Sequence, residues 1–154
     1  MKPIQNSQNF HFVSEVRVRL NETDTMGIVF HGHFFTYMDV GRIDYLRNLD
    51  LMEPHRPIKG FDSAVVHASS DFVSPARFED IVTIHIRIAE LGKSSMTFEF
   101  LLVNKKQNRL LGNGKNVLVA LDGKSWKPIE IPESFRKIIR EFEGESLKET
   151  WKPS

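Results

Sequence analysis

An aspartate and two histidines lie close together in the segment NETDTMGIVFHGHFF, residues 21–35. Asp24 is followed by a glycine, an apolar triplet and then His31 and His33. A carboxylate can act as a nucleophile or a general base, and a histidine can carry protons or orient a polar group. These residue types also bind metals, but a catalytic zinc usually needs three protein ligands, and no second cluster in the sequence supplies more. We therefore expect no metal site.

A long helix is predicted to begin at about His33, directly after this segment, and to end near Asn48. Its apolar residues recur at helical spacing on one stripe, namely Phe34, Phe35, Met38, Tyr45, Leu46 and Leu49. The first backbone N–H groups of a helix are unpaired and lie at the positive end of its dipole, so they can stabilise an oxyanion. Together with Asp24, this helix start would supply the base or nucleophile and the oxyanion hole that chemistry at an activated acyl carbonyl requires.

The rest of the chain reads mainly as strands that could hold this helix in place. Apolar and polar residues alternate over residues 10–20, 82–88 and 96–102, which predicts half-buried strands. Two more strands are expected at residues 64–72 and 110–121. Because one helix must bury a stripe and one sheet must bury a face, we expect the sheet to wrap around the helix.

A second, shorter helix is predicted over about residues 132–143, with Pro132 near its start. The final residues, GESLKETWKPS, are expected to be frayed or mobile. The length of 154 residues fits a single domain, residues 1–154, with a core over about residues 10–132.

Composition excludes several classes of function. Lys and Arg number 21 and Asp and Glu number 20, a balance that predicts no nucleic-acid partner. The absence of cysteine excludes disulfides, thiolate metal sites and a cysteine nucleophile. The longest apolar run, VLVAL, is far shorter than the roughly 20 residues of a membrane-spanning helix, and the polar first residues do not predict a secretory signal. We expect a cytoplasmic protein without a membrane span.

The segment TDTMGIVFHGHFFTYMDVGRIDYL resembles the signature of the hotdog-fold acyl-CoA thioesterases. The most similar groups are the 4-hydroxybenzoyl-CoA thioesterase family and its relatives associated with the Tol-Pal system. Asp24, Gly27, the apolar residues 28–30, His31 and Arg42 follow the order of the family pattern. Segments at residues 74–100 and 117–132 add weaker similarity, so the likeness covers about residues 12–132.

This resemblance implies an α+β hotdog fold, in which a five-stranded antiparallel sheet wraps around one long helix. It also implies homodimers whose sheets join edge to edge, often paired again into homotetramers, with active sites between subunits. It implies no cofactor, because the coenzyme A thioester is itself the substrate.

The resemblance further assigns Asp24 as the catalytic carboxylate, which either attacks the thioester carbonyl or activates water for that attack. The backbone N–H groups of His31 and Gly32 become the predicted oxyanion donors. The His31 side chain either orients water or substrate, or only satisfies the helix start. Asp39, on the long helix, is a reserve candidate for the carboxylate and is also spaced to pair with Arg42.

Four further residues are candidates for contacts with the substrate. Phe30 and Phe34 belong mostly to the core, and one of them could wall the acyl pocket. Lys93 and Ser94, in the hairpin between the strands at 82–88 and 96–102, are candidates for contacts with coenzyme A. A solvated hairpin explains Lys93 and Ser94 at least as well.

Two other functions compete with thioester hydrolysis. A hotdog enoyl-CoA hydratase or dehydratase would use Asp24 and His31 as its acid–base pair, although their spacing differs from the hydratase motif. A non-catalytic acyl-CoA-binding protein would have no need for Asp24. The acyl group could be short, long or aromatic, and its carrier could be coenzyme A or an acyl carrier protein.

Overall fold

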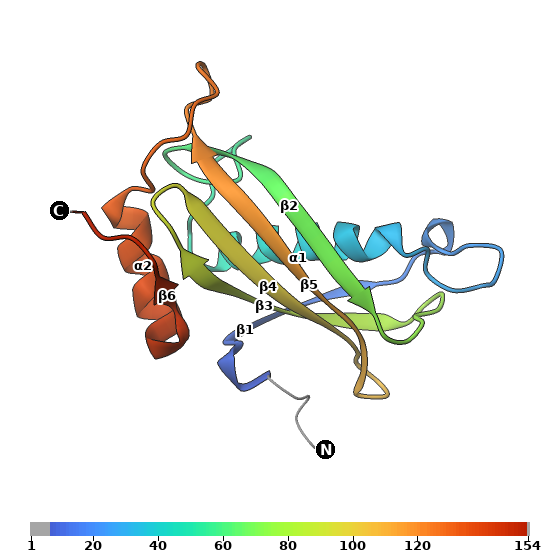
Figure 1. The fold of residues 1–154 in the computed structure, drawn as a ribbon. Helices are drawn as coiled ribbons and strands as arrows, with labels where there is room; N and C mark the ends of the chain where they lie inside the picture. Colours follow the sequence, from blue (N-terminus) through green and yellow to red (C-terminus); the bar gives the residue numbers. More distant parts are fainter. Residues whose placement is uncertain (1–6, 154) are drawn as a thin grey trace.

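The computed structural model describes residues 7–153, in which one antiparallel sheet wraps around the long helix α1 (Gly32–Asn48) (Figure 1). Five strands form the main path of the sheet, and they follow the spatial order β1, β3, β4, β5, β2. Their bounds are β1 (Phe12–Arg17), β3 (Ile81–Leu91), β4 (Ser95–Asn104), β5 (Arg109–Leu121) and β2 (Asp62–Phe72). The predicted architecture of one sheet around one helix is confirmed. β2 pairs with β5 rather than with its sequence neighbour β3, which leaves β2 at the sheet edge.

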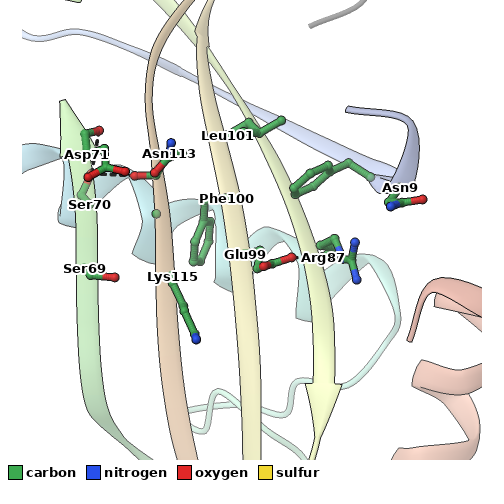
Figure 2. A pocket seen from close by; sticks show the side chains of 12 residues that line it. Asn9, Ser69, Ser70, Asp71, Arg87, Glu99, Phe100, Leu101, Asn113 and Lys115 are labelled. Atoms are coloured by element: carbon green, nitrogen blue, oxygen red, sulfur yellow. Dashed lines mark hydrogen bonds and ion pairs between the residues drawn. The ribbon is translucent and has the colours of Figure 1, made fainter. Parts of the chain in front are cut away.

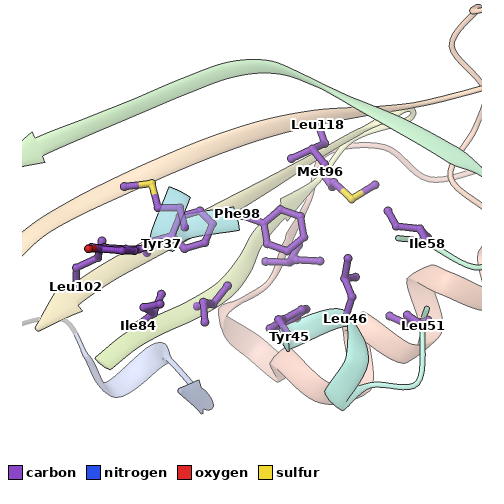
Figure 3. Close-up of a cluster of buried hydrophobic side chains, with 14 of the residues drawn as sticks. Tyr37, Tyr45, Leu46, Leu51, Ile58, Ile84, Met96, Phe98, Leu102 and Leu118 are labelled. Atoms are coloured by element: carbon purple, nitrogen blue, oxygen red, sulfur yellow. The ribbon is translucent and has the colours of Figure 1, made fainter. Parts of the chain in front are cut away.

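Alternation in the strands directs one row of apolar side chains from each central strand toward α1 (Figure 3). Ile84 and Ile86 of β3 and Phe98 of β4 are fully excluded from solvent. Gly41 allows the helix to approach this row closely, because a Cβ atom there would lie only 2.7 Å from Cγ2 of Ile84. The helix therefore sits deep in the curve of the sheet, and its start is held in a fixed place.

The C-terminal segment differs from the frayed tail expected from the sequence. After α2 (Glu133–Glu143), residues 144–146 form a 3-10 turn and β6 (Lys148–Glu149) pairs in parallel with β3, as a short sixth strand. The Trp151 ring then lies 5.1 Å from the guanidinium carbon of Arg136, a residue that is 1% exposed. Backbone pairing and this cation–π contact explain why the tail docks.

Two buried tyrosines tie α1 to elements outside the sheet. The Tyr37 hydroxyl donates to Oε1 of Glu22 over 2.9 Å, and the Tyr45 hydroxyl donates to Oε1 of Glu143 over 3.0 Å. Burial raises the pKa of Glu143 to about 7, although the hydrogen bond from Tyr45 and the nearby charge of Arg87 act in the opposite direction. Within residues 7–153, no helix has the length and apolarity needed to cross a bilayer.

Candidate active site

Asp24 lies in a tight hairpin between the 3-10 turn Leu20–Glu22 and the start of α1. The Asp24 N–H donates to the Ile28 carbonyl over 2.8 Å, and the Gly27 N–H donates back to the Asp24 carbonyl over 3.0 Å. Gly27 has a φ of +77°, a conformation that L side chains rarely adopt, so the turn favours glycine. The Met26 N–H donates to Oδ1 of Asp24 over 2.8 Å, which orients the carboxylate within its own turn.

The start of α1 leaves two donors available beside this hairpin. The His33 N–H donates to the Phe30 carbonyl over 2.9 Å, and the Phe34 N–H donates to the His31 carbonyl over 3.1 Å. In the described part of the chain, the N–H groups of His31 and Gly32 have no protein acceptor. These are the two groups predicted from the sequence as oxyanion donors, and their lack of an intramolecular partner leaves them free to bind a ligand oxygen.

Asp24 and His31 line one pocket of about 320 Å³ at this end of the molecule. The remaining lining residues are mostly apolar and come from the hairpin, from α1, from the end of β2 and from the segment that follows it, namely Ile28, Val29, Phe34, Phe72, Val73, Ser74 and Pro75. The pocket thus places a carboxylate, a helix start and an apolar wall around one space. Such a space suits an acyl group whose carbonyl lies next to Asp24.

Aromatic rings form one wall of the pocket. Phe34 and Phe72 meet edge to face with ring centres 5.1 Å apart, and the His31 ring lies 5.6 Å from that of Phe72. Phe34 is buried and lines the pocket, whereas Phe30 is 46% exposed and its ring covers Gly32. Phe72 was not predicted from the sequence, because only the pairing of β2 with β5, which sets it opposite Gly112, brings it to α1.

Lys93 and Ser94 do not reach this pocket within one chain. The Ser94 carbonyl accepts from the Ala120 N–H over 2.7 Å, near one end of the long strand β5 (Figure 1). The pocket lies toward the other end of β5, where Phe72 pairs with Gly112. The Lys93 ammonium lies 5.9 Å from the centre of the Trp151 ring. Contact between these residues and coenzyme A stays a prediction. Coenzyme A bound at the pocket of one chain would not reach Lys93 and Ser94 of that same chain.

The remaining candidates lie elsewhere. Asp39 forms an ion pair with Arg42 over 2.8 Å, as its spacing predicts, and it is not among the residues that line the pocket. Over residues 7–153, no group of three or more His, Cys, Asp or Glu side chains is placed to hold a metal ion.

A larger pocket of about 480 Å³ lies over the strands on the side away from α1 (Figure 2). Charged side chains from neighbouring strands meet there, including Arg87 and Glu99, which form an ion pair over 3.6 Å. It shares no lining residue with the pocket that contains Asp24. Arg87 is already paired with Glu99 and the pocket includes no helix start, so we do not assign catalysis to it.

Glu22, two residues before Asp24, is an ionisable group that the sequence did not single out. It is 2% exposed, and its carboxylate accepts hydrogen bonds from the Arg19 backbone over 2.8 Å, from the Arg19 guanidinium over 2.6 Å and from Tyr37. Burial alone would raise the pKa of Glu22, but these hydrogen bonds outweigh it and lower the pKa, so the group stays ionised. The spacing of Arg19 and Glu22 was the only local signal, since the contact with Tyr37 depends on the fold.

Comparisons with known proteins identify the family of this chain. Residues 26–111 match the thioesterase superfamily. The acyl-CoA thioester hydrolase YbgC of Escherichia coli O6:H1 is 27% identical over 127 residues, which cover 82% of this chain and 92% of YbgC.

Solved structures of thioesterases are also similar to this chain. A thioesterase from Thermus thermophilus, crystallised with coenzyme A and Zn, is 30% identical, with a TM-score of 0.76 over 89% of this chain and 98% of that chain. A 1,4-dihydroxy-2-naphthoyl-CoA thioesterase from Synechocystis shares the fold, with 22% identity and a TM-score of 0.76 over 83% of this chain and 94% of that chain. The hotdog fold and the thioesterase class predicted from the sequence are confirmed, and the chain belongs to the thioesterase superfamily.

Proposed function

We propose that this protein hydrolyses acyl-CoA thioesters, with Asp24 as nucleophile or general base and the start of α1 as the oxyanion hole. The observation that carries the proposal is the shared pocket of Asp24 and His31 beside two helix N–H groups without a protein acceptor. The likeness to the E. coli and T. thermophilus proteins supports coenzyme A as the carrier of the acyl group.

In the proposed reaction the thioester carbonyl carbon lies next to Asp24 and its oxygen accepts from the N–H groups of His31 and Gly32. Attack by the Asp24 carboxylate, or by water that Asp24 deprotonates, places negative charge on that oxygen, where the helix start stabilises it. The carbon–sulfur bond then breaks, and the thiolate of coenzyme A takes up a proton. Where Asp24 is the nucleophile, the acyl group is left on its carboxylate as a mixed anhydride, which water hydrolyses to release the acid and restore Asp24. Water supplies the oxygen and the protons of the net reaction, which yields a carboxylic acid and free coenzyme A.

The test is release of free thiol from a panel of thioesters. The panel runs from acetyl-CoA to palmitoyl-CoA and includes an aromatic acyl-CoA, an acyl carrier protein thioester and a conjugated enoyl-CoA. We expect selective hydrolysis of acyl-CoA. Any loss of the enoyl absorbance should be accompanied by release of free thiol. Hydration of the enoyl-CoA in place of hydrolysis, or no thiol release from any member, would contradict the proposal.

We also propose that the active form is a homodimer joined through β2. This strand pairs with β5 along one edge, and among residues 7–153 no strand pairs with its other edge. Its exposed apolar side chains include Val65, Val66 and Phe72, which are 46%, 61% and 50% exposed. A long apolar edge strand is a template for pairing with another chain. Because Phe72 also walls the pocket, a second copy at this edge would complete the substrate site.

Replacing Val66 with glutamate should convert the dimer to a monomer and lower thioesterase activity, because each copy would bury an unpaired carboxylate at the joint. Light scattering coupled to size-exclusion chromatography measures the mass of each protein in solution and so its oligomeric state. The control is Val13→Glu on β1, the other edge strand, where the valine is 44% exposed and the dimer should persist. A monomeric wild-type protein, or a Val66→Glu protein that stays dimeric, would refute β2 as the joint.

A further inference from the structure

We propose that Tyr37 and Glu22 are positioning residues for Asp24, which hold its carboxylate at a fixed place relative to the start of α1. The inference rests on the proposed role of Asp24 and adds the contact that sets its geometry. Neither residue lines the pocket, so their effect on the reaction must pass through the hairpin that carries Asp24.

The hairpin is built on Glu22. The Phe30 N–H donates to the Glu22 carbonyl over 2.9 Å, and Thr23 pairs with Val29 in the next rung. The hydrogen bond from Asp24 to Ile28 forms the rung after that. A displacement of Glu22 would therefore be transmitted through these rungs to Asp24.

Two contacts hold the hairpin to the rest of the molecule from opposite sides. On the sheet side, the Val29 N–H donates to the Ala76 carbonyl over 2.8 Å. On the helix side, the Glu22 carboxylate accepts from the Tyr37 hydroxyl over 2.9 Å. Tyr37 belongs to α1 and is 1% exposed, so its ring is immobilised by the core.

The helix-side contact matters most for the proposed chemistry, because the oxyanion donors are on the same helix as Tyr37. The distance between the Asp24 carboxylate and the N–H groups of His31 and Gly32 depends on how the hairpin sits against α1. A hydrogen bond from a hydroxyl to a carboxylate is charge-assisted and directional, and at a buried site it tolerates little displacement. This bond therefore fixes the carboxylate and the oxyanion hole as one unit.

The test is the Tyr37→Phe variant, which keeps the ring and removes only the donated hydrogen bond. We expect kcat to fall about tenfold with KM nearly unchanged, since a misplacement of about 1 Å can cost up to about 100-fold. The matched control is Tyr45→Phe. Tyr45 is also a buried tyrosine of α1 that donates to a buried glutamate, Glu143, and the loss of its hydroxyl should leave kcat unchanged.

A second measurement separates positioning from general destabilisation. In an Asp24→Asn background, Tyr37→Phe should have no further effect on the residual rate, because the group that it positions is gone. Glu22→Gln, whose amide oxygen can still accept from Tyr37, should retain more of kcat than Tyr37→Phe does.

An equal loss of kcat in Tyr45→Phe, or additive losses in the double variant, would overturn the inference while leaving Asp24 in its role. An Asp24→Asn protein with full activity would instead overturn the proposed function itself.

Discussion

An Asp24→Asn protein should fold as the wild type does and hydrolyse its best acyl-CoA about a thousand times more slowly, within the range typical for the loss of an acid–base group. In the wild type, the Met26 N–H donates to Oδ1 of Asp24 over 2.8 Å. The amide oxygen of asparagine can accept the same hydrogen bond, so the turn should persist. The amide cannot attack the thioester or deprotonate water. The residual rate would come from the oxyanion donors and from substrate binding.

The experiment compares kcat for thiol release in wild type, Asp24→Asn and Asp39→Asn, with the melting temperature of each. Asp39, on α1, is the reserve candidate for the catalytic carboxylate, and it is exposed and paired with Arg42. Its variant should keep full activity. If Asp39→Asn abolished turnover and Asp24→Asn did not, the catalytic carboxylate would be on α1 and the assignment to the hairpin would be wrong.

The second large effect concerns stability and originates at Glu143, which is 1% exposed and has one carboxylate oxygen without a hydrogen-bond partner. Its pKa lies at about 7 in the folded protein against an ordinary value of 4.5. The folded state therefore binds the proton more tightly than the unfolded state does. The stability that this provides is complete below about pH 4.5 and is lost as the pH rises through about 7. Each pKa unit corresponds to about 1.4 kcal/mol, so the total loss is about 3 kcal/mol.

Glu143→Gln should remove this pH dependence, because the amide does not ionise and can still accept from Tyr45. Urea unfolding at pH 5 and at pH 8 measures the pH dependence of the free energy of unfolding. The difference in free energy of unfolding between variant and wild type should grow by about 2.5 kcal/mol in favour of the variant between pH 5 and pH 8. Glu141→Gln, an exposed change on the same helix, serves as the control. A constant difference between the two pH values would show that Glu143 is ionised throughout.

Much of the fold could be predicted because its signals are local. The alternation in β3 and β4 and the apolar stripe of α1 each lie within one segment, and the predicted helix His33–Asn48 differs from α1 by one residue. β6 has only two residues, too few for any periodicity, and it forms because α2 delivers it to β3. Its pairing depends on packing between distant segments, which no local pattern encodes.

The candidate site likewise contains residues that a local segment predicts and residues that only the fold brings together. Asp24, His31 and Gly32 lie in one short segment, so the motif identified them together. Phe72 comes from β2, and its place depends on strand pairing across the sheet. The contact of Glu22 with Tyr37 depends on how the hairpin folds back on α1, and Lys93 is separated from Asp24 by the length of β5. Residues far apart in the chain could not be placed relative to Asp24 without the fold.

The first and last strands of the chain share one edge of β3. β1 pairs with residues 81–86 and β6 with residues 90–91, while β4 occupies the opposite edge. During synthesis, β1 must therefore wait for β3 to leave the ribosome, and the end of β3 stays open until β6 has emerged. A nascent or prematurely terminated chain would expose the backbone of Glu90 and Leu91 as a site for pairing with another chain. The two-residue strand β6 therefore covers a stretch of backbone that would otherwise be open to pairing with another chain.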